Sequence, residues 1–260
     1  MPAPGSPDQP RATPVPGPDV ALRAEPLRGE RSIASPLRRR NGLDAGGRWM
    51  MCNLYNQTRA QEAMRQLFQP LGLSDRAGNL EPGNVYPDQL APIIRNAAEG
   101  GLELVKARWG MPTPPQHLKT QRDPRVTNIR NTASLHWRRW LEPGHRCLVP
   151  LTAFAEPLGK GRGNQWFAPA DDCPAFLAGI ETRSWRSVRK VKDGETTDDL
   201  FGFLTTTPNA EVAPIHQKAM PVILTEPNDW QAWLTAPWTE ARALQRPLPN
   251  GSLRLIAPAS

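Results

Sequence analysis

The sequence predicts an α+β fold in which short helices flank a curved, mostly antiparallel β-sheet or barrel-like core. Short apolar stretches bounded by proline or glycine recur through residues 51–260, as expected for strands. Few stretches show the period of an amphipathic helix. The chain also has 30 prolines in 260 residues, about 11.5% against a typical ~5%, which excludes a long helical bundle or coiled coil.

The first elements of the body are a helix and a loop. A helix is expected between Thr58, which can cap it, and Pro70, which ends it. Its apolar residues recur at helical spacing: Ala63, Met64, Leu67 and Phe68. Residues 71–88 are expected to be a loop, because glycine and proline recur through them.

Strands are expected to dominate the rest of the body. The candidates are Leu90–Arg95, Leu102–Trp109, Arg146–Val149, Gln165–Ala168, Ala175–Ile180 and Leu200–Thr205. The basic run Arg186–Lys192 precedes the acidic stretch Asp193–Asp199, which predicts a hairpin with an exposed charged tip. A short helix over Asp229–Leu234 and a last strand over Leu253–Ile256 complete the predicted domain.

Residues 1–50 are expected to be a disordered leader, separate from a folded domain over residues 51–258. They hold nine prolines, six glycines, eight arginines and no lysine, and their apolar residues show no period. Such a segment buries too little apolar surface to offset the entropy of ordering it. It lacks the apolar core of a secretory signal, and its five carboxylates argue against a mitochondrial transit peptide.

Charge and cysteine content narrow the class of protein. The net charge of +7, from 32 basic and 25 acidic residues, permits an anionic partner without requiring one. No run of 18 apolar residues predicts a membrane span. Three cysteines without a C-x-x-C pair favour the cytoplasm over a secreted disulfide framework, and we expect no metal and no cofactor. Two of them, Cys147 and Cys173, are expected to be structural.

Cys52 is the first candidate for chemistry, because it directly follows Met51. Removal of Met51 would give an N-terminal residue with a thiol and an α-amine, whose pKa is about 8. Such an aminothiol condenses with an aldehyde: the amine forms an imine and the thiol then closes a thiazolidine ring. A buried structural cysteine is the alternative interpretation.

Three further segments carry candidate side chains. Asn128 offers a donor and an acceptor, and Arg130 offers a fork suited to phosphate; a capped turn is the alternative. Glu156 ends a long apolar run, where a carboxyl can act as general acid or base, or can simply lie at a strand end. His216 precedes an apolar strand and could transfer protons or be structural.

Eight short motifs follow one another along roughly residues 51–258. They are Met51-Cys52, Pro92-Ile93-Ile94, Trp109-Gly110-Met111-Pro112, Asn128-Ile129-Arg130, Arg146-Cys147-Leu148-Val149-Pro150, Phe154-Ala155-Glu156, Leu204-Thr205-Thr206, and Ile215-His216 with Met220-Pro221-Val222-Ile223-Leu224. Together and in this order they resemble the SRAP (SOS response-associated peptidase) family, the abasic-site processing proteins. The start Met-Cys-Asn-Leu-Tyr indicates a distinct subfamily.

The resemblance implies the SRAP fold and a covalent reaction with DNA. In that family the N-terminal cysteine crosslinks an abasic site in single-stranded DNA as a stable thiazolidine, which shields the lesion in the SOS response to DNA damage. By motif, Cys52 is the nucleophile, Asn128 positions its amine, Glu156 is the general acid/base, and His216 assists opening of the sugar ring. The DNA-binding residues implied are Arg130, Trp109, Met111, Pro112, Lys218 and Thr205, with Trp109, Met111 and Pro112 forming a wedge beside the displaced base.

The resemblance also implies the setting of the activity. We expect a monomeric, cytoplasmic and nucleoid-associated enzyme whose partner is single-stranded DNA containing abasic sites. Its activity would be lyase-like crosslinking, with cysteine-type peptidase activity. An autopeptidase that cleaves before Cys52, or a noncatalytic single-strand-binding module, are the alternatives.

Three features depart from the family pattern. The usual arginine two residues after the cysteine is replaced by Leu54, the asparagine motif lacks its following glutamate, and Lys218 stands where an arginine is common. Residues 1–50 would block the α-amine of Cys52. Either translation starts at Met50 or Met51, or the leader is removed, and the absence of a predicted fold in the leader favours the first explanation.

Overall fold

The structure, a computed structural model, describes residues 53–58, 61–159, 161–171 and 173–257. The expected disordered leader lies outside the described residues. The expectation of an α+β domain with a curved, mostly antiparallel and barrel-like sheet is confirmed.

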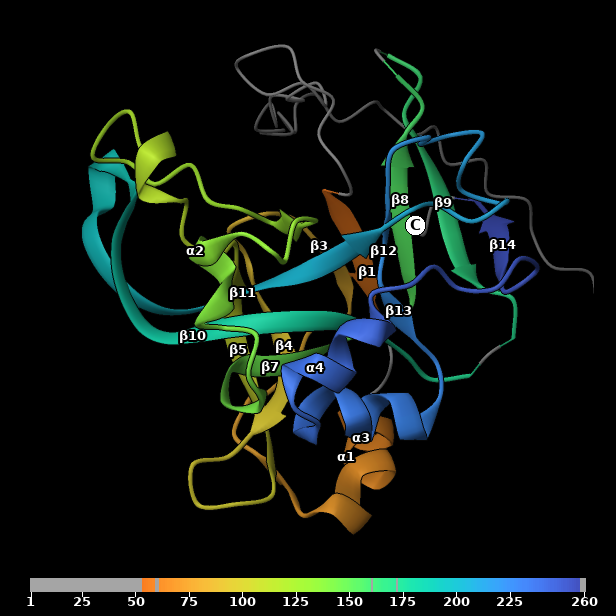
Figure 1. Cartoon of the computed structure of the whole chain (residues 1–260), viewed down its shortest axis with the longest axis horizontal. Helices are drawn as coiled ribbons and strands as arrows, with labels where there is room; N and C mark the ends of the chain where they lie inside the picture. The colour runs from red at the N-terminus through yellow and green to blue at the C-terminus, as the bar shows by residue number, and fades with distance from the viewer. Residues whose placement is uncertain (1–52, 59–60, 160, 172, 258–260) are drawn as a thin grey trace, which may run out of the picture. The chain divides into compact units, whose positions relative to one another are not determined.

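A closed barrel forms the centre of the domain (Figure 1). Its strands lie in the order β11-β10-β7-β4-β5, and β5 pairs back with β11, parallel to it, which closes the barrel. Their bounds are β4 Leu90–Asn96, β5 Leu102–Trp109, β7 Arg146–Leu151, β10 Ala175–Lys190 and β11 Gly194–Thr206. Shorter strands extend it: β2 Leu73–Asp75, β6 Asn128–Ile129, β12 Met220–Pro221 and β13 Ile223–Leu224.

A second sheet of five strands lies beside the barrel, in the order β14-β9-β8-β1-β3. Its strands are β1 Leu54–Gln57, β3 Gly83–Val85, β8 Ala153–Pro157, β9 Asn164–Pro169 and β14 Leu253–Ile256. Only one residue, Thr152, separates β7 from β8, so the chain passes directly from the barrel into the second sheet.

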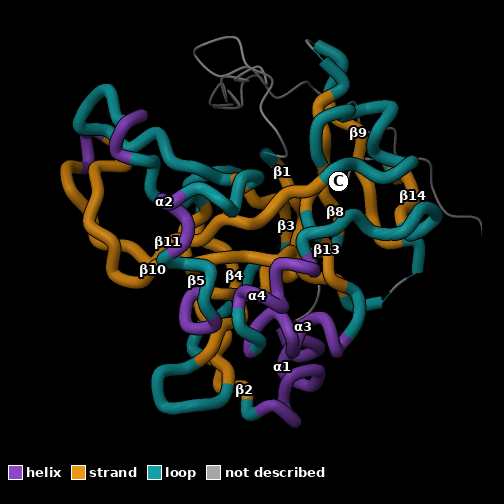
Figure 2. Tube along the Cα trace, in the orientation of Figure 1, coloured by secondary structure: helices purple, strands orange, loops and turns teal. Residues whose placement is uncertain are grey.

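Side chains on the barrel strands alternate between two cores, as the strand period of two requires. On β4, Ile94 belongs to the core shared with the helices, and Ile93 belongs to the core shared with the second sheet. Figure 2 shows α1, α3 and α4 gathered at one side of the barrel strands. The helices are α1 Gln61–Phe68, α2 Leu135–Arg138, α3 Pro227–Thr235 and α4 Trp238–Ala241.

The hairpin expected from the charge pattern is confirmed. β10 and β11 form a long antiparallel pair joined by a 3₁₀ turn over Val191–Asp193. The register shifts twice along the pair, and Figure 1 shows both strands curving strongly. Arg186 and Glu195 form an exposed ion pair near the tip.

Other parts of the fold differ from the sequence expectations. The expected loop 71–88 contains β2 and β3, and the long apolar run 147–157 is divided between β7 and β8.

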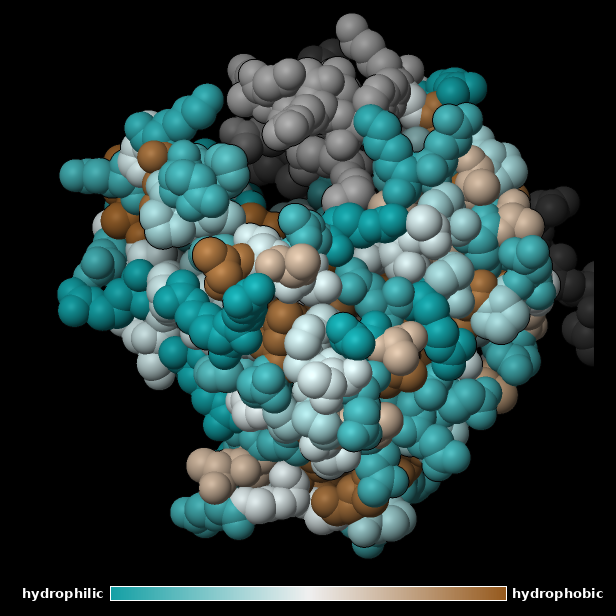
Figure 3. All heavy atoms as spheres, viewed as in Figure 1, coloured by the Kyte–Doolittle hydropathy of each residue, from teal (hydrophilic) through white to brown (hydrophobic). Residues whose placement is uncertain are grey.

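None of the helices in the described part is long and apolar enough to cross a membrane. On the face shown in Figure 3, hydrophilic residues predominate and the apolar ones are scattered, so this face presents no broad apolar surface.

Candidate active site

Cys52 lies outside the described residues, whereas the strand that follows it in the sequence, β1, is described. β1 begins at Leu54 and pairs with β8 so that Leu54 is opposite Ala155. Continuing this antiparallel register by one residue puts Asn53 opposite Glu156. The chain therefore enters β1 beside Glu156.

Glu156 is almost completely buried, with 1% of its surface exposed. It lies on β8 opposite Gln165 of β9. Alternation along the strand places its side chain on the same face as Phe154, which belongs to the core between the barrel and the second sheet. Glu156 thus points toward the barrel, and Tyr55, opposite Phe154, marks that face on β1.

Asn128 reaches the same region from the barrel. It forms β6 with Ile129 and lies opposite Phe203 in a parallel pairing with β11. Its side-chain nitrogen donates to the hydroxyl of Thr127 at 3.0 Å. Arg130 follows at the end of this strand and is exposed to solvent, as a phosphate-binding side chain would need to be.

An aromatic group connects the strand after Cys52 with the strand of Asn128. The ring of Tyr55 lies edge-on to Trp109 at 5.2 Å, and Trp109 stacks on Phe203, which is the partner of Asn128 in the sheet. The indole nitrogen of Trp109 also donates to the carbonyl of Thr127 at 3.2 Å. These buried contacts fix β1 relative to Asn128, so the two candidate segments are held by a rigid core.

The burial of Trp109 corrects one expectation. Trp109 and Met111 have no exposed surface, and Pro112 is buried as well. The ring of Trp109 is stacked on Phe203 and packed against Tyr55, so it is already used within the core and does not face a displaced base. In this structure Trp109 and Met111 belong to the two cores and Pro112 is buried, so the three residues do not form an exposed wedge.

His216 lies in a tight turn before β12. Its ring nitrogen Nδ1 is 2.7 Å from the carbonyl oxygen of Ala219. The backbone N–H of Ala219 also donates to Nδ1 at 3.2 Å, so the turn holds the ring through this nitrogen in either tautomer. Lys218 in the same turn is exposed.

β11 brings the His216 turn to the Asn128 strand. Its end pairs with β6 through Leu204 and with β12 through Thr205, which is opposite Pro221. Thr205 is 1% exposed, and its hydroxyl has no hydrogen-bond partner among the residues described. The candidates Asn128, Arg130, Thr205 and the His216 turn are thus gathered around one strand end, and Glu156 lies on β8 of the second sheet.

Gln245 is a residue of this region that the sequence does not reveal. Its side-chain nitrogen donates to the carbonyls of Arg130 and Thr205, both at 3.0 Å, and its side-chain oxygen accepts from the hydroxyl of Thr132 at 2.9 Å. One amide therefore ties the segment after Asn128 to the end of β11. No sequence motif marks it.

Replacing Gln245 with leucine is expected to loosen this connection. The carbonyls of Arg130 and Thr205 would lose their donor, at a cost of about 1–3 kcal/mol in the free energy of unfolding. Urea denaturation measures that cost, and hydrogen exchange of the amides in residues 128–132 should accelerate. Gln231→Leu, at an exposed position of α3, is the matched control. Unchanged exchange in Gln245→Leu would contradict the role of this amide.

The other cysteines differ from one another. Cys147 is fully buried, and burial raises the pKa of its thiol well above the usual range, so it is an inert structural residue. Cys173 is exposed, which does not fit the expected structural role.

In the part of the chain that is described, no group of three or more His, Cys, Asp or Glu side chains could hold a metal ion.

A closed barrel joined to a second sheet, with polar candidates gathered at the end of β11, defines the class of the domain as α+β with a barrel-like core. The chain belongs to the SRAP family: the family model described as SOS response associated peptidase matches residues 51–257. This membership confirms the resemblance on which the site residues rest and supports a role in the SOS response. No curated protein matches the sequence.

Solved structures have the same fold. A protein from Bordetella bronchiseptica is 26% identical, with a TM-score of 0.57 over 80% of this chain and 100% of its own. A protein from Bacteroides thetaiotaomicron is 19% identical, with a TM-score of 0.60 over 78% of this chain and 90% of its own. A phage-related protein from Bordetella bronchiseptica is 20% identical, with a TM-score of 0.56 over 79% of this chain and 93% of its own.

Proposed function

We propose that the protein forms a covalent crosslink between Cys52, as the N-terminal residue, and an abasic site in single-stranded DNA. The observation that carries the proposal is the arrangement around the start of β1. Glu156 lies beside the strand that follows Cys52, and the buried ring of Tyr55 connects that strand with the one bearing Asn128. The family to which the chain belongs supports the same chemistry.

The reaction needs only proton transfers and the loss of one water. The closed sugar breaks its ring C–O bond to give an aldehyde. The α-amine of Cys52 adds to the carbonyl, and the resulting carbinolamine loses water to form an imine. The thiol then adds to the imine carbon while the nitrogen takes a proton, which closes the thiazolidine.

Each side chain has a distinct task in these steps. Glu156 would donate and accept protons as the ring opens and water leaves, which a carboxyl shielded from solvent can do. Asn128 would hold the amine, and the ring of His216 would assist the opening of the sugar by proton transfer. Arg130, exposed at the end of β6, and Lys218 would contact backbone phosphates.

The test is an intact mass measurement on protein purified from its native host, before and after incubation with abasic single-stranded DNA. The expected protein begins at Cys52, and the adduct has the mass of protein plus DNA less one water. Cys52→Ala should abolish the adduct. A chain that retains the residues before Cys52 and gives no adduct would contradict the proposal.

Peptidase activity on the chain itself is the second candidate, because the family is described as a peptidase family. The same spectra test it. Full-length wild-type protein would lose the residues before Cys52, while Cys52→Ala would keep them. Loss of the leader from both proteins would show that cleavage does not depend on this thiol.

A further inference from the structure

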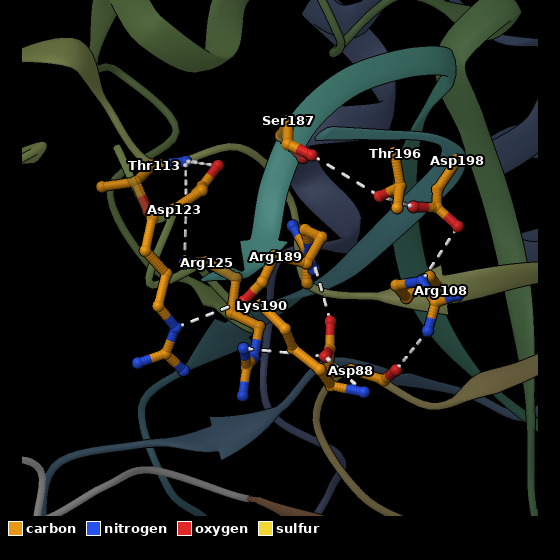
Figure 4. Close-up of polar contacts among 12 residues, drawn as sticks. Asp88, Arg108, Thr113, Asp123, Arg125, Ser187, Arg189, Lys190, Thr196 and Asp198 are labelled. Atoms are coloured by element: carbon orange, nitrogen blue, oxygen red, sulfur yellow. Dashed lines mark hydrogen bonds and ion pairs between the residues drawn. The ribbon is translucent and has the colours of Figure 1, made fainter. Parts of the chain in front are cut away.

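A group of cations outside the candidate active site surrounds Asp88. It consists of Arg125, Arg189 and Lys190, which approach the carboxylate of Asp88, and of Arg122, which contacts Arg189. We call these four basic residues and Asp88 the Asp88 cluster. Figure 4 shows Arg125, Arg189 and Lys190 extending toward Asp88.

The cluster has more positive charge than its carboxylate can neutralise. Arg189 donates from Nε to Asp88 at 3.1 Å, which is a hydrogen bond. Arg125 Nη1 and Lys190 Nζ each lie 3.9 Å from the other oxygen of Asp88, beyond hydrogen-bond distance. The exposed Lys190 is therefore loosely held and can turn to another anion.

A second carboxylate, that of Asp123, attracts Arg125 and offsets part of this excess, but the four cations still outnumber the two carboxylates. Asp123 accepts hydrogen bonds from the backbone and hydroxyl of Thr113 and from the backbone nitrogen of Arg125. Its oxygens are thus used to shape the loop. Burial is the main cause that lowers the pKa of Arg125, and the nearby charges of Arg189 and Arg122 lower it further, against the attraction of Asp88 and Asp123. Arg189 and Arg122 thus repel the positive charge of Arg125.

The backbone is built to bring these arginines together. A side chain at Gly110 would lie 2.7 Å from Nη2 of Arg189 and 2.9 Å from Cβ of Arg125, so only glycine permits this approach. Arg125 itself has φ of 64°, a conformation that costs about 1–3 kcal/mol. Arg189 is 4% exposed, and among the described residues its Nη1 has no hydrogen-bond partner. The guanidinium of Arg189 therefore holds its positive charge close to Arg125 with only one side-chain hydrogen bond to a carboxylate in the described part of the chain.

The cluster is continuous with the candidate active site. Arg122 forms an isolated β-bridge with Val188 of β10. Further along the same loop, Val126 forms a second β-bridge with Met111. Two residues later the same segment becomes β6, with Asn128. Arg122, at the start of this segment, and Lys190, at the end of β10, are both exposed to solvent.

We propose that the Asp88 cluster is a second binding site for backbone phosphates of single-stranded DNA, with Arg122 and Lys190 as the direct contacts. The site extends the strand path beyond Arg130 and supplies positive charge near a site that lacks the family's arginine after the cysteine. This inference rests on the proposed binding of single-stranded DNA.

The test measures the affinity for undamaged single-stranded DNA as a function of salt. Each phosphate contact to a single strand contributes about 0.7 to the slope of log affinity against log salt. The double variant Arg122→Gln, Lys190→Gln should therefore bind more weakly, with a slope less steep by about 1.4. The exchange Arg122→Lys, Lys190→Arg keeps both charges and should keep most of the slope.

The control removes the same charge elsewhere. Arg76→Gln, Lys106→Gln takes two exposed cations from the region of β2 and β5 and should leave the slope close to that of the wild type. Melting temperatures verify that all variants fold. A slope that is unchanged in the Arg122, Lys190 variant, or that changes equally in the control, would overturn the inference. Because the DNA is undamaged, the slope is measured independently of the crosslinking reaction, whose failure would contradict the proposed function instead.

Discussion

Replacing Glu156 with glutamine is expected to slow crosslink formation by about 10²- to 10⁴-fold, the usual contribution of a general acid or base. Glutamine has the same size and can occupy the same buried position on β8, but it cannot exchange a proton with the sugar. Single-turnover formation of the adduct at saturating abasic DNA measures the effect. Affinity for undamaged DNA should change little, because the side chain has almost no exposed surface.

Two comparisons sharpen this measurement. Glu99→Gln changes an exposed carboxylate in the turn between β4 and β5 and should react at the wild-type rate. Unfolding by urea separates a lost proton donor from a damaged sheet. A Glu156→Gln protein that is folded and reacts as fast as the wild type would remove this carboxyl from the mechanism.

The sequence predicted those features of the fold that depend on local pattern. The basic and acidic blocks predicted the hairpin of β10 and β11, because the two halves of a hairpin are neighbours in the chain. The helix before Pro70 was predicted from its apolar spacing and is α1, Gln61–Phe68. β1 was missed because its last two residues, Asn56 and Gln57, are polar although both are buried.

The site was predictable only as a set of motifs. Their order along the chain indicated the family, but not which side chains face solvent. Trp109 is buried because β5 closes the barrel against β11, a pairing between residues more than ninety positions apart. Gln245 bonds to Arg130, 115 residues away, so its role depends entirely on the tertiary fold.

Replacing Glu181 with glutamine is expected to lower the free energy of unfolding by about 3 kcal/mol or more, the largest loss among the substitutions proposed. Glu181 is fully buried and accepts from Arg95 at 2.7 Å and from Arg183 at 2.9 Å. Burial disfavours the charged form of Arg95, but Glu181 and its other carboxylate partners outweigh this and raise its pKa. The guanidinium therefore stays charged and would remain in the barrel wall without its main counterion.

A glutamate-to-glutamine substitution in an exposed ion pair provides the control. It removes the same charge at a place where water can solvate the cation that remains. Glu195 pairs with Arg186 on the hairpin, with half or more of each side chain exposed, so Glu195→Gln should cost less than about 1 kcal/mol. At roughly 2–4 °C per kcal/mol for a domain of this size, the melting temperature should fall by about 6–12 °C in Glu181→Gln and by no more than about 4 °C in Glu195→Gln. Equal shifts in the two variants would mean that solvent, or the remaining partners Glu103 and Asp199, already screen the charge of Arg95.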